Sequence, residues 1–301
     1  MEASKAQTRL EQAKEEVGQV LGGRWKLTGI VGQGGMATVY KAESMMTGQS
    51  CAVKVLSQDV VKPRILSRFE REARILSSLN HTNVSHFIDF GFDERLESHY
   101  IVMELLRGWS LYRYVKRHGA LPLHAVVSIT GQIASALEAV GQLGVVHRDL
   151  KPSNIFLQIK PAPARAKLID FGLAKDPDPE LMLTRPGQLC GTALYMSPEM
   201  AQGHPIDHRS DLYSLGVILY ELVTGRCPFS GGLLPVLQGH AHGAPPSAAT
   251  LWKLKEEPHA ELLELIDWLL VKDPDQRPQN ARVVRQKLVK IYHELSNAGS
   301  H

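Results

Sequence analysis

The chain has 301 residues, which is long for one small domain and sufficient for two lobes that share a cleft. Apolar residues make up 44% and charged residues 22%, an ordinary balance for a soluble globular protein. The net charge of +3 is spread along the chain, so we expect no nucleic-acid partner. The three cysteines form no CxxC pair, which excludes a disulfide framework or zinc knuckle and favours reduced thiols.

Targeting and membrane segments are not expected. The N-terminus is charged and lacks the apolar region of a signal peptide. The best apolar stretch, Leu212 to Val223, is shorter than the roughly 18 residues that a membrane span needs, and it contains Glu221. We therefore expect no membrane segment in this chain and a cytoplasmic location.

The N-terminal segment Ala3 to Leu21 is predicted to be a polar helix that ends at Gly22 and Gly23. One side of this helix carries an apolar stripe at helical spacing, made of Leu10, Ala13, Val17 and Leu21. The stripe predicts docking onto a neighbouring surface or a partner, or else a loosely ordered flank.

The next part of the chain is predicted to be β-rich. Alternation and β-branched residues predict strands between Trp25 and Leu56, and two more strands at Val84 to Phe92 and Tyr100 to Leu105. One helix, Pro63 to Leu79, separates them. From Trp109 onward the pattern is mostly helical. The sequence therefore predicts an α+β fold with a small β-rich lobe and a larger helical lobe.

A glycine-rich segment, Gly32-Gln-Gly34-Gly35-Met-Ala-Thr-Val, lies between the first two predicted strands. Glycine lets the backbone approach phosphates and expose its N–H groups. A dinucleotide-binding turn would need a helix directly afterwards, but Thr38-Val-Tyr continues as strand. A Walker-type loop would need Gly-Lys-Ser/Thr, which is absent. A glycine-rich β-turn that covers a nucleotide remains.

Lys54 lies among apolar residues on a predicted buried strand, in Ala52-Val-Lys54. A lone lysine is more often a surface residue with a buried stem. A buried one needs a carboxylate partner, and Glu72 on the next predicted helix can supply it, because Glu70 points to another side.

The segment Val146 to Ile155 places six polar or charged residues at fixed offsets, and Leu168 to Gly172 follows as a short strand ending in an acid. Asn154 and Asp170 offer two oxygen ligands that suit Mg²⁺. Asp149 is placed to orient a hydroxyl proton, and Lys151 to neutralise charge on a moving phosphoryl group.

With these motifs in order, the chain resembles the protein kinase family from about Trp25 to Leu295. Later markers agree: Gly191 to Glu199 resembles the end of an activation segment, and Asp211 to Gly216 the helix that anchors the catalytic loop. Arg277 resembles the buried partner of Glu199. Gly34-Gly35-Met, Tyr213 in place of the tryptophan of many eukaryotic members, and Gly225-x-x-Pro-Phe229 resemble the bacterial, eukaryotic-like (Hanks-type) serine/threonine kinases.

The resemblance implies a bilobal kinase fold and an ATP- and Mg²⁺-dependent protein kinase, with Mn²⁺ as an alternative metal. The implied parts are a helical flank (1–24), an N-lobe (25–105), a C-lobe (106–295) and a disordered tail (296–301). The implied catalytic residues are Lys54, Glu72, Asp149 and Lys151, and the metal ligands are Asn154 and Asp170. The implied ATP-binding residues are Val31, Gly32, Gln33, Gly34, Gly35, Met36, Ala37, Val39, Ala52, Lys54, Met103, Glu104, Leu106 and Phe156.

Two departures from the family pattern are Ala37 at the third glycine of the loop and Ser197 before Pro-Glu. Neither removes a catalytic group. Lys151-Pro and Thr192 resemble the serine/threonine branch rather than the tyrosine branch. Two other functional classes stay open: a nucleotide-binding pseudokinase or scaffold, and a kinase of small molecules, which the intact Gly191 to Glu199 segment disfavours.

Thr184 is the only hydroxyl-bearing residue between Asp170 and Thr192, which makes it the predicted autophosphorylation site and switch. Arg148, Lys175 and Arg68 are predicted to meet its phosphate. The expected partners are protein substrates with Ser or Thr, the chain itself through autophosphorylation, and a second copy in a dimer. The chain is also interpreted as a catalytic domain cut from a longer protein that carries a membrane anchor.

Overall fold

The computed structural model describes residues 2–34, 36–58, 61–159, 164–171 and 191–298. The chain divides into two compact units. Unit 1 comprises residues 1–80 and 85–107, and unit 2 comprises residues 81–84 and 108–301. Gly35, Gly172, Lys175 and Thr184, which the sequence analysis singled out, lie outside the described residues.

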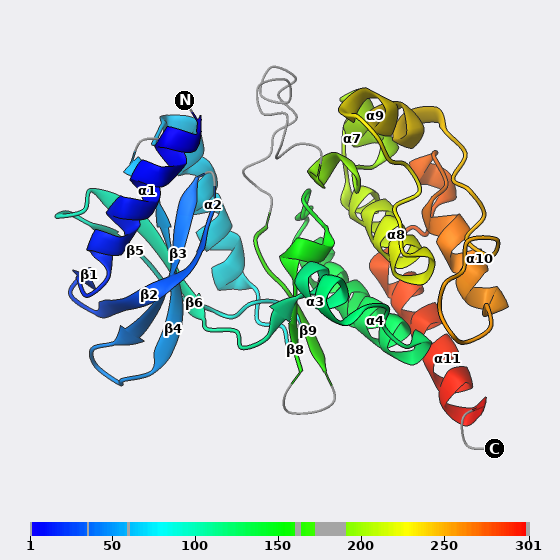
Figure 1. The fold of residues 1–301 in the computed structure, drawn as a ribbon, viewed down its shortest axis with the longest axis horizontal. Coiled ribbons are helices and arrows are strands. Elements are labelled where there is room, and N and C mark those ends of the chain that lie inside the picture. Colours follow the sequence, from blue (N-terminus) through cyan, green and yellow to red (C-terminus); the bar gives the residue numbers. More distant parts are fainter. Residues whose placement is uncertain (1, 35, 59–60, 160–163, 172–190, 299–301) are drawn as a thin grey trace. The chain divides into compact units, whose positions relative to one another are not determined.

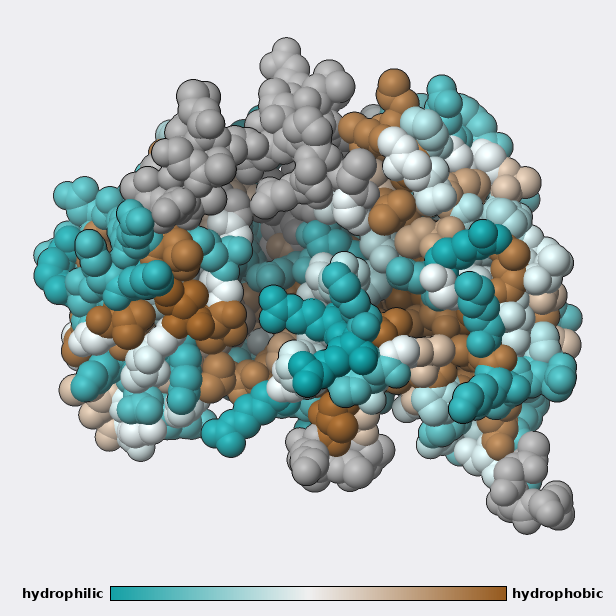
Figure 2. Space-filling model, in the orientation of Figure 1, coloured by the Kyte–Doolittle hydropathy of each residue, from teal (hydrophilic) through white to brown (hydrophobic). Residues whose placement is uncertain are grey.

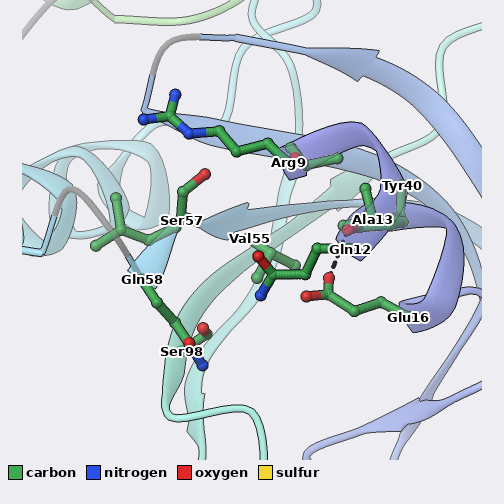
Figure 3. Close-up of a pocket in the computed structure, with 11 residues that line it drawn as sticks. Arg9, Gln12, Ala13, Glu16, Tyr40, Val55, Ser57, Gln58 and Ser98 are labelled. Atoms are coloured by element: carbon green, nitrogen blue, oxygen red, sulfur yellow. Dashed lines mark hydrogen bonds between the residues drawn. The ribbon is translucent and has the colours of Figure 1, made fainter. Parts of the chain in front are cut away.

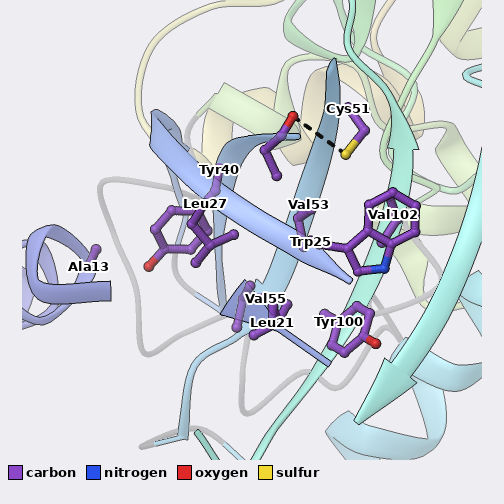
Figure 4. Packing of buried hydrophobic residues seen from close by; sticks show 11 residues of the cluster. Ala13, Leu21, Trp25, Leu27, Tyr40, Cys51, Val53, Val55, Tyr100 and Val102 are labelled. Carbon is purple, nitrogen blue, oxygen red and sulfur yellow. Dashed lines mark hydrogen bonds between the residues drawn. The ribbon is translucent and has the colours of Figure 1, made fainter. Parts of the chain in front are cut away.

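Unit 1 is built on one antiparallel sheet with the strand order β1-β2-β3-β4-β6-β5 (Figure 1). Its strands are β1 (Val20–Leu21), β2 (Trp25–Gln33), β3 (Ala37–Ser44), β4 (Ser50–Leu56), β5 (Phe87–Asp93) and β6 (Ser98–Glu104). Alternating side chains of β2 point inward, beginning with Trp25 and Leu27. They join a buried cluster with Tyr40, Val53 and Val102 from three neighbouring strands (Figure 4).

Helix α1 (Glu2–Glu16) packs on β2, and Ala13, Val17 and Leu21 of the predicted stripe join the core of unit 1, whereas Leu10 is 38% exposed. Ala13 is buried in the same cluster, and the Tyr40 hydroxyl donates a hydrogen bond to the Glu16 carboxylate (Figure 3). The expected helix was wrong over residues 17–21. Gly18 has a φ of 96°, which continues no right-handed helix, and Leu21 then enters β1.

Helix α2 (Pro63–Ser78) begins at a proline, which is suited to the first turn because it lacks an N–H group. Its inner face buries Phe69, Glu72, Ala73, Ile75 and Leu76. Phe69 packs against Phe90 of β5 with ring centroids 6.3 Å apart. The burial of Glu72 on an otherwise apolar face is the feature of this helix that matters for chemistry.

Unit 2 is mainly helical and contains a small sheet of β7, β8 and β9 (Figure 1). Its first elements are β7 (Trp109–Ser110), α3 (Leu111–His118), α4 (Leu123–Gln142), the 3-10 helix η2 (Pro152–Asn154), β8 (Ile155–Gln158) and β9 (Arg165–Leu168). The later elements are α7 (Pro198–Gln202), α8 (His208–Thr224), α9 (Leu233–His242), α10 (Ala260–Leu269), the 3-10 helix η4 (Pro274–Gln276) and α11 (Ala281–Ala298).

Helix α8 lies at the centre of unit 2 and packs against α4, α7 and α10. Nearly every residue of α8 is buried, so it is apolar on all sides except where polar side chains meet partners. Among the described helices, α4 alone is long and apolar enough to cross a membrane by length and composition, and 56% of its apolar window is buried. A core helix passes the same test, and α4 packs against α8, α11 and β9.

The predicted order of elements is found, with differences at their ends. The strand predicted from Val84 begins at Phe87, because residues 81–84 belong to unit 2. There, the Asn83 side chain donates a hydrogen bond to the Ala166 carbonyl at 2.8 Å, and Val84 bridges to Leu168. Helix α11 includes residues 296–298, the first part of the segment expected as a tail.

Candidate active site

The glycine-rich segment forms the turn of the β2–β3 hairpin in unit 1. Gln33 pairs with Thr38, and the Gly34 N–H donates a hydrogen bond to the Ala37 carbonyl at 2.9 Å. Ala37 is not among the described non-glycine residues with positive φ. Alanine is therefore unstrained at this position, and the departure from the family's third glycine has no conformational cost. Strand, not helix, follows the turn, as the sequence predicted.

Lys54 and Glu72 form an ion pair within unit 1. The Lys54 Nζ lies 2.8 Å from the Glu72 Oε1, and the two side chains are 16% and 6% exposed. Lys54 comes from β4 and Glu72 from the buried face of α2. Because a buried carboxylate must be compensated, this pair fixes the lysine ammonium relative to the sheet.

The residues predicted to contact adenine occupy neighbouring strands of unit 1, except Phe156 on β8 of unit 2. Ala52 of β4 is the register partner of Met103 in β6, and Val39 is the partner of Lys54. The Glu104 N–H already donates to the His86 carbonyl at 2.9 Å.

The other predicted residues of the nucleotide site lie around the hairpin and after β6. Val31 and Gly32 are part of β2, and the Val31 side chain is 54% exposed. Leu106 follows β6 directly, and its side chain is partly buried. The Met36 carbonyl accepts a hydrogen bond from the Ser57 N–H at 3.0 Å, which ties the end of the turn to the end of β4.

Asp149 lies at the centre of a hydrogen-bonded cluster in unit 2. The Lys151 Nζ contacts both carboxylate oxygens of Asp149, at 3.0 and 2.9 Å, and donates to the Thr192 Oγ1 at 3.1 Å. The Asn154 amide donates to the Asp149 carbonyl at 2.9 Å and to its carboxylate at 3.1 Å. The structure thus brings together three predicted residues and adds the hydroxyl of Thr192.

The backbone of this loop is fixed from helix α8. The Asp211 carboxylate accepts hydrogen bonds from the N–H groups of His147 and Arg148, at 2.6 and 3.0 Å. Burial raises the pKa of Asp211 to about 6, although both N–H donors oppose the shift. Arg148 has a φ of 66°, a left-handed conformation that is strained in a non-glycine residue, so the loop needs this external support.

His147 is a neutral, fully buried ring beside the candidate metal ligands. Burial lowers its pKa to about 4, against the opposing effect of the Asp149 carboxylate. Its Nδ1 accepts from the Asp149 N–H at 3.3 Å, so its Nε2 carries the proton that faces the Ile169 carbonyl at 3.4 Å. The ring also packs against Phe171 with centroids 5.0 Å apart.

Asn154 and Asp170 fit a Mg²⁺ ion by donor chemistry. The Ile169 N–H donates to the Asn154 carbonyl at 3.0 Å, so the backbones next to both side chains are joined. The Asn154 amide nitrogen already binds Asp149, which leaves its amide oxygen as an acceptor. Asp170 has a φ of 51°, a second strained position in the loop region. Mg²⁺ takes few protein oxygens together with waters and phosphates, as this pair allows.

Glu199 and Arg277 form the buried ion pair that the sequence predicted by resemblance. The Arg277 guanidinium meets both carboxylate oxygens, at 2.8 and 2.7 Å, and Ser210 donates to Oε1 at 2.5 Å. Burial alone would raise the pKa of Glu199, but hydrogen bonds from Arg277 and Ser210 outweigh it and hold the pKa below its usual value.

The family model described as the protein kinase domain matches residues 25–289. The chain belongs to the protein kinase family. The serine/threonine-protein kinase Pkn2 of Myxococcus xanthus is 38% identical over 285 residues, which cover 92% of this chain and 33% of Pkn2. The kinase PknA of Mycobacterium tuberculosis is 38% identical over 266 residues, 87% of this chain and 59% of PknA.

The fold of this kinase family member also matches a solved structure. The crystal structure of a double mutant of the PknI kinase domain from Mycobacterium tuberculosis has a TM-score of 0.70. It covers 91% of this chain and 98% of the PknI chain at 23% identity, which shows a common fold. The α+β fold class is thereby confirmed. The chain spans between 33% and 59% of the length of the two curated relatives named above.

Sequence reasoning missed several polar residues that support the site. Thr192 was used only as a branch marker, although its hydroxyl binds Lys151. Ser214 was not noticed, although its hydroxyl donates to the Tyr195 carbonyl at 2.7 Å. The available signal was a serine next to the apolar run of a predicted core helix, since a buried hydroxyl needs a hydrogen-bond partner.

The Glu199–Arg277 pair yields a stability prediction. Replacing Arg277 by Ala leaves an uncompensated buried carboxylate, so the free energy of unfolding at pH 7 should fall by roughly 3–5 kcal/mol. Arg282→Ala is the control, because Arg282 is 60% exposed in its pair with Glu138 and such pairs contribute about 0–1 kcal/mol. Urea unfolding monitored by circular dichroism measures both.

The same experiment has a pH dependence whose sign follows from the lowered pKa of Glu199. The pair stabilises the fold above the unfolded-state pKa of a glutamate, about 4.3, and this contribution disappears as the pH falls below that value. The difference in unfolding free energy between wild type and Arg277→Ala should therefore persist from pH 7 down to about pH 4.3 and narrow below that pH. A difference that is small at pH 7, or that widens in acid, contradicts the assignment.

Proposed function

We propose that this chain transfers the γ-phosphate of ATP to serine and threonine hydroxyls of proteins, and that it acts in signal transduction. The observation that carries the proposal is the cluster in which Asp149 is bound by Lys151 and Asn154, with the Thr192 hydroxyl on the same lysine. A hydroxyl acceptor needs a carboxylate to orient its proton, and a phosphoryl group in transfer needs a nearby cation.

The roles of the residues follow from their charges and contacts. Lys54, held by Glu72, binds the α- and β-phosphates, and the hairpin that contains Gly34 covers the phosphates. Asp149 orients the substrate hydroxyl, and Lys151 neutralises charge on the γ-phosphate. Mg²⁺ bound through Asn154 and Asp170 would supply further neutralisation of the phosphates. Little covalent work falls to the protein, since positioning and charge account for most of such catalysis.

The contacts that fix residues 191–199 favour protein substrates over small molecules. The Tyr195 hydroxyl donates to the Glu221 carboxylate at 2.7 Å, and Glu199 is held by Arg277. A segment fixed at two points in a buried environment suits the recognition of an extended peptide. The nucleotide comes from the cytoplasm, and we place the catalytic domain there.

The proposal predicts that Lys54→Ala and Asp149→Asn each lose about 10²–10⁴ in the rate of phosphate transfer, because each removes a positioned charge or proton acceptor. Lys41→Ala is a matched control, since Lys41 is an exposed lysine on the neighbouring strand β3. Transfer of radiolabelled phosphate from ATP to a generic acceptor protein is the measurement.

Nucleotide binding separates this function from the alternative of a pseudokinase. Asp149→Asn should still bind ATP with Mg²⁺, while its transfer rate falls. If wild type binds ATP but transfers no phosphate to itself or to any acceptor protein, the chain is a binding scaffold and the proposal is wrong.

Substrate choice is predicted from unit 2. Kinases that favour arginine three residues before the acceptor resemble one another in carrying acids at the positions of Ser110 and Ser153. Here Ser110 instead caps α3 by accepting from the Arg113 N–H at 3.3 Å. Helix α3 continues with three basic residues in its last turn, and hydrophilic side chains gather over it (Figure 2). The sequence contains no Asp or Glu from Leu105 to Leu137.

We therefore expect no strong demand for arginine at this substrate position, and we expect acidic residues around the acceptor to increase the rate. The measurement is a peptide array that varies each position with Arg, Ala and Glu, repeated at high salt to screen the charges. A strong demand for arginine three residues before the acceptor would refute this prediction.

Activation-loop autophosphorylation at Thr184 is the proposed regulation. Arg148 is one of the cations expected to meet the phosphate, and its buried Nε has no hydrogen-bond partner among the described residues. A phosphate adds about −1.5 to −2 charges and forms one to three charge-assisted hydrogen bonds. Such bonds would order the loop and favour the active state.

Thr184→Ala should then slow substrate phosphorylation by roughly tenfold or more, on the order of 1.4 kcal/mol. Peptide mapping by mass spectrometry after incubation with Mg-ATP should find phosphate on Thr184. An active enzyme with unmodified Thr184, or an alanine variant with full activity, rules out this switch.

A further inference from the structure

His240 of α9 is a fully buried histidine that the proposed chemistry does not use. Its Nε2 lies 3.0 Å from the Leu194 carbonyl, and its Nδ1 lies 3.1 Å from the Tyr213 hydroxyl. A carbonyl oxygen only accepts hydrogen bonds, so Nε2 must carry a proton. Burial lowers the pKa of His240 to about 4, and the ring is neutral with Nδ1 as an acceptor.

The tautomer of His240 determines which atoms donate in the hydrogen bonds around it. The Tyr213 hydroxyl must donate to Nδ1, so its oxygen is free to accept from the Lys272 Nζ at 3.2 Å. The other two protons of Lys272 go to the carbonyls of Gly239 and His240, at 3.1 and 2.9 Å. The hydrogen bonds therefore point in one direction, from Lys272 through Tyr213 and His240 to Leu194, and each polarises the next.

Aromatic packing holds the ammonium at the start of this chain. The Lys272 Nζ lies 4.6 Å from the centre of the Phe229 ring, and Phe229 meets the His240 ring edge-on at 5.0 Å. A Cβ atom at Gly239 would lie 2.6 Å from the Phe229 ring, so glycine is needed there for this close approach. Phe229 thus places Lys272 against the backbone carbonyls and Tyr213.

The chain of hydrogen bonds ends in the segment 191–199. The Leu194 carbonyl is fixed by His240, and the next carbonyl, of Tyr195, accepts from the Ser214 hydroxyl at 2.7 Å. Thr192, which lies two residues before Leu194, binds Lys151 of the cluster around Asp149. Side chains around Leu194 pack in an apolar cluster made of Ala193, Leu194, Met196, Met200, Leu233, Val236 and Leu237.

We propose that Lys272, Tyr213 and His240 form a polarised hydrogen-bond relay that positions residues 191–199 for binding of a protein substrate. The inference rests on the proposed function. These three are positioning residues: none of them touches the reacting groups, and they act through the Leu194 carbonyl.

The relay accounts for tyrosine at position 213, where many eukaryotic kinases carry tryptophan. The tyrosine hydroxyl donates to His240 and accepts from Lys272 at the same time. An indole N–H only donates, so tryptophan could satisfy His240 but would leave one Lys272 proton without its acceptor.

The kinetic test compares two tyrosines of helix α8. Tyr213→Phe removes the relay hydroxyl, whereas Tyr220→Phe removes a hydroxyl that donates to the Pro246 carbonyl at 3.0 Å, away from residues 191–199. Tyr213→Phe should raise the KM for a protein substrate about fivefold, the ratio that one net hydrogen bond corresponds to, and leave the KM for ATP unchanged. Tyr220→Phe should change neither KM.

Two further variants keep the kinetic test decisive if one protein folds poorly. His240→Phe should raise the same KM, and the double variant with Tyr213→Phe should be no worse than His240→Phe alone, because the relay acts as a unit. Full additivity of the two changes, or equal effects of Tyr213→Phe and Tyr220→Phe, overturns the proposal.

A second readout does not depend on kinase activity. Nitrogen-15 NMR of histidine-labelled protein at pH 7 should show His240 protonated at Nε2 and bare at Nδ1, and the Nδ1 signal should move in Tyr213→Phe but not in Tyr220→Phe. The opposite tautomer overturns the relay. If the wild type phosphorylates no protein while the NMR result holds, the proposed function fails and the relay geometry stands.

Discussion

The carboxylate of Asp211 is the constraint on which the loop of residues 146–155, the proposed catalytic loop, depends. It lies in the first turn of a helix buried on all sides, and it binds the N–H groups of His147 and Arg148. Arg148 adopts a left-handed conformation that a non-glycine residue avoids unless its surroundings impose it. Without the two hydrogen bonds to Asp211, the backbone before Asp149 could relax, and the cluster around that carboxylate would lose its geometry.

Other polar residues of α8 hold residues 191–199, the proposed substrate-binding segment, in the same way. Ser210 donates to Glu199, Ser214 donates to the Tyr195 carbonyl, and Glu221 accepts from the Tyr195 hydroxyl. An interior helix presents these side chains from a rigid element, which is more accurate than support from a loop. The loop of residues 146–155 and residues 191–199 are therefore both hydrogen-bonded to helix α8. A shift of either segment relative to the other requires breaking buried hydrogen bonds.

The charged residues of the candidate site could be predicted from the sequence, because they occur in motifs with fixed spacing. The pairing of Lys54 with Glu72 could be proposed since a lysine on a buried strand needs a carboxylate. The relay could not be found in this way. Its members Tyr213, His240 and Lys272 are separated by 27 and 32 positions, and each is unremarkable alone. Only packing of α8, α9 and the loop before η4 brings them together.

The end of α1 shows the same limit on a smaller scale. The apolar stripe continued to Leu21 at helical spacing, and this periodicity is compatible with both a longer helix and a strand that re-enters the core. The left-handed conformation of Gly18 decided between them. Glycine permits this conformation without requiring it, so tertiary packing of Leu21 in the core of unit 1 determined the outcome.

The charged residues of the candidate active site differ from the residues that fix the backbone around it. Lys54, Asp149 and Lys151, the residues proposed to act on phosphate and hydroxyl groups, keep 16%, 11% and 20% of their side chains exposed, as access of a substrate requires. The groups at the end of the relay, Tyr213 and His240, are fully buried and neutral. Neutral dipoles fix geometry without the desolvation cost of an ion, and their directions are set once all donors and acceptors are paired. The buried ions at Asp211 and Glu199 are tolerated because each accepts several strong donors.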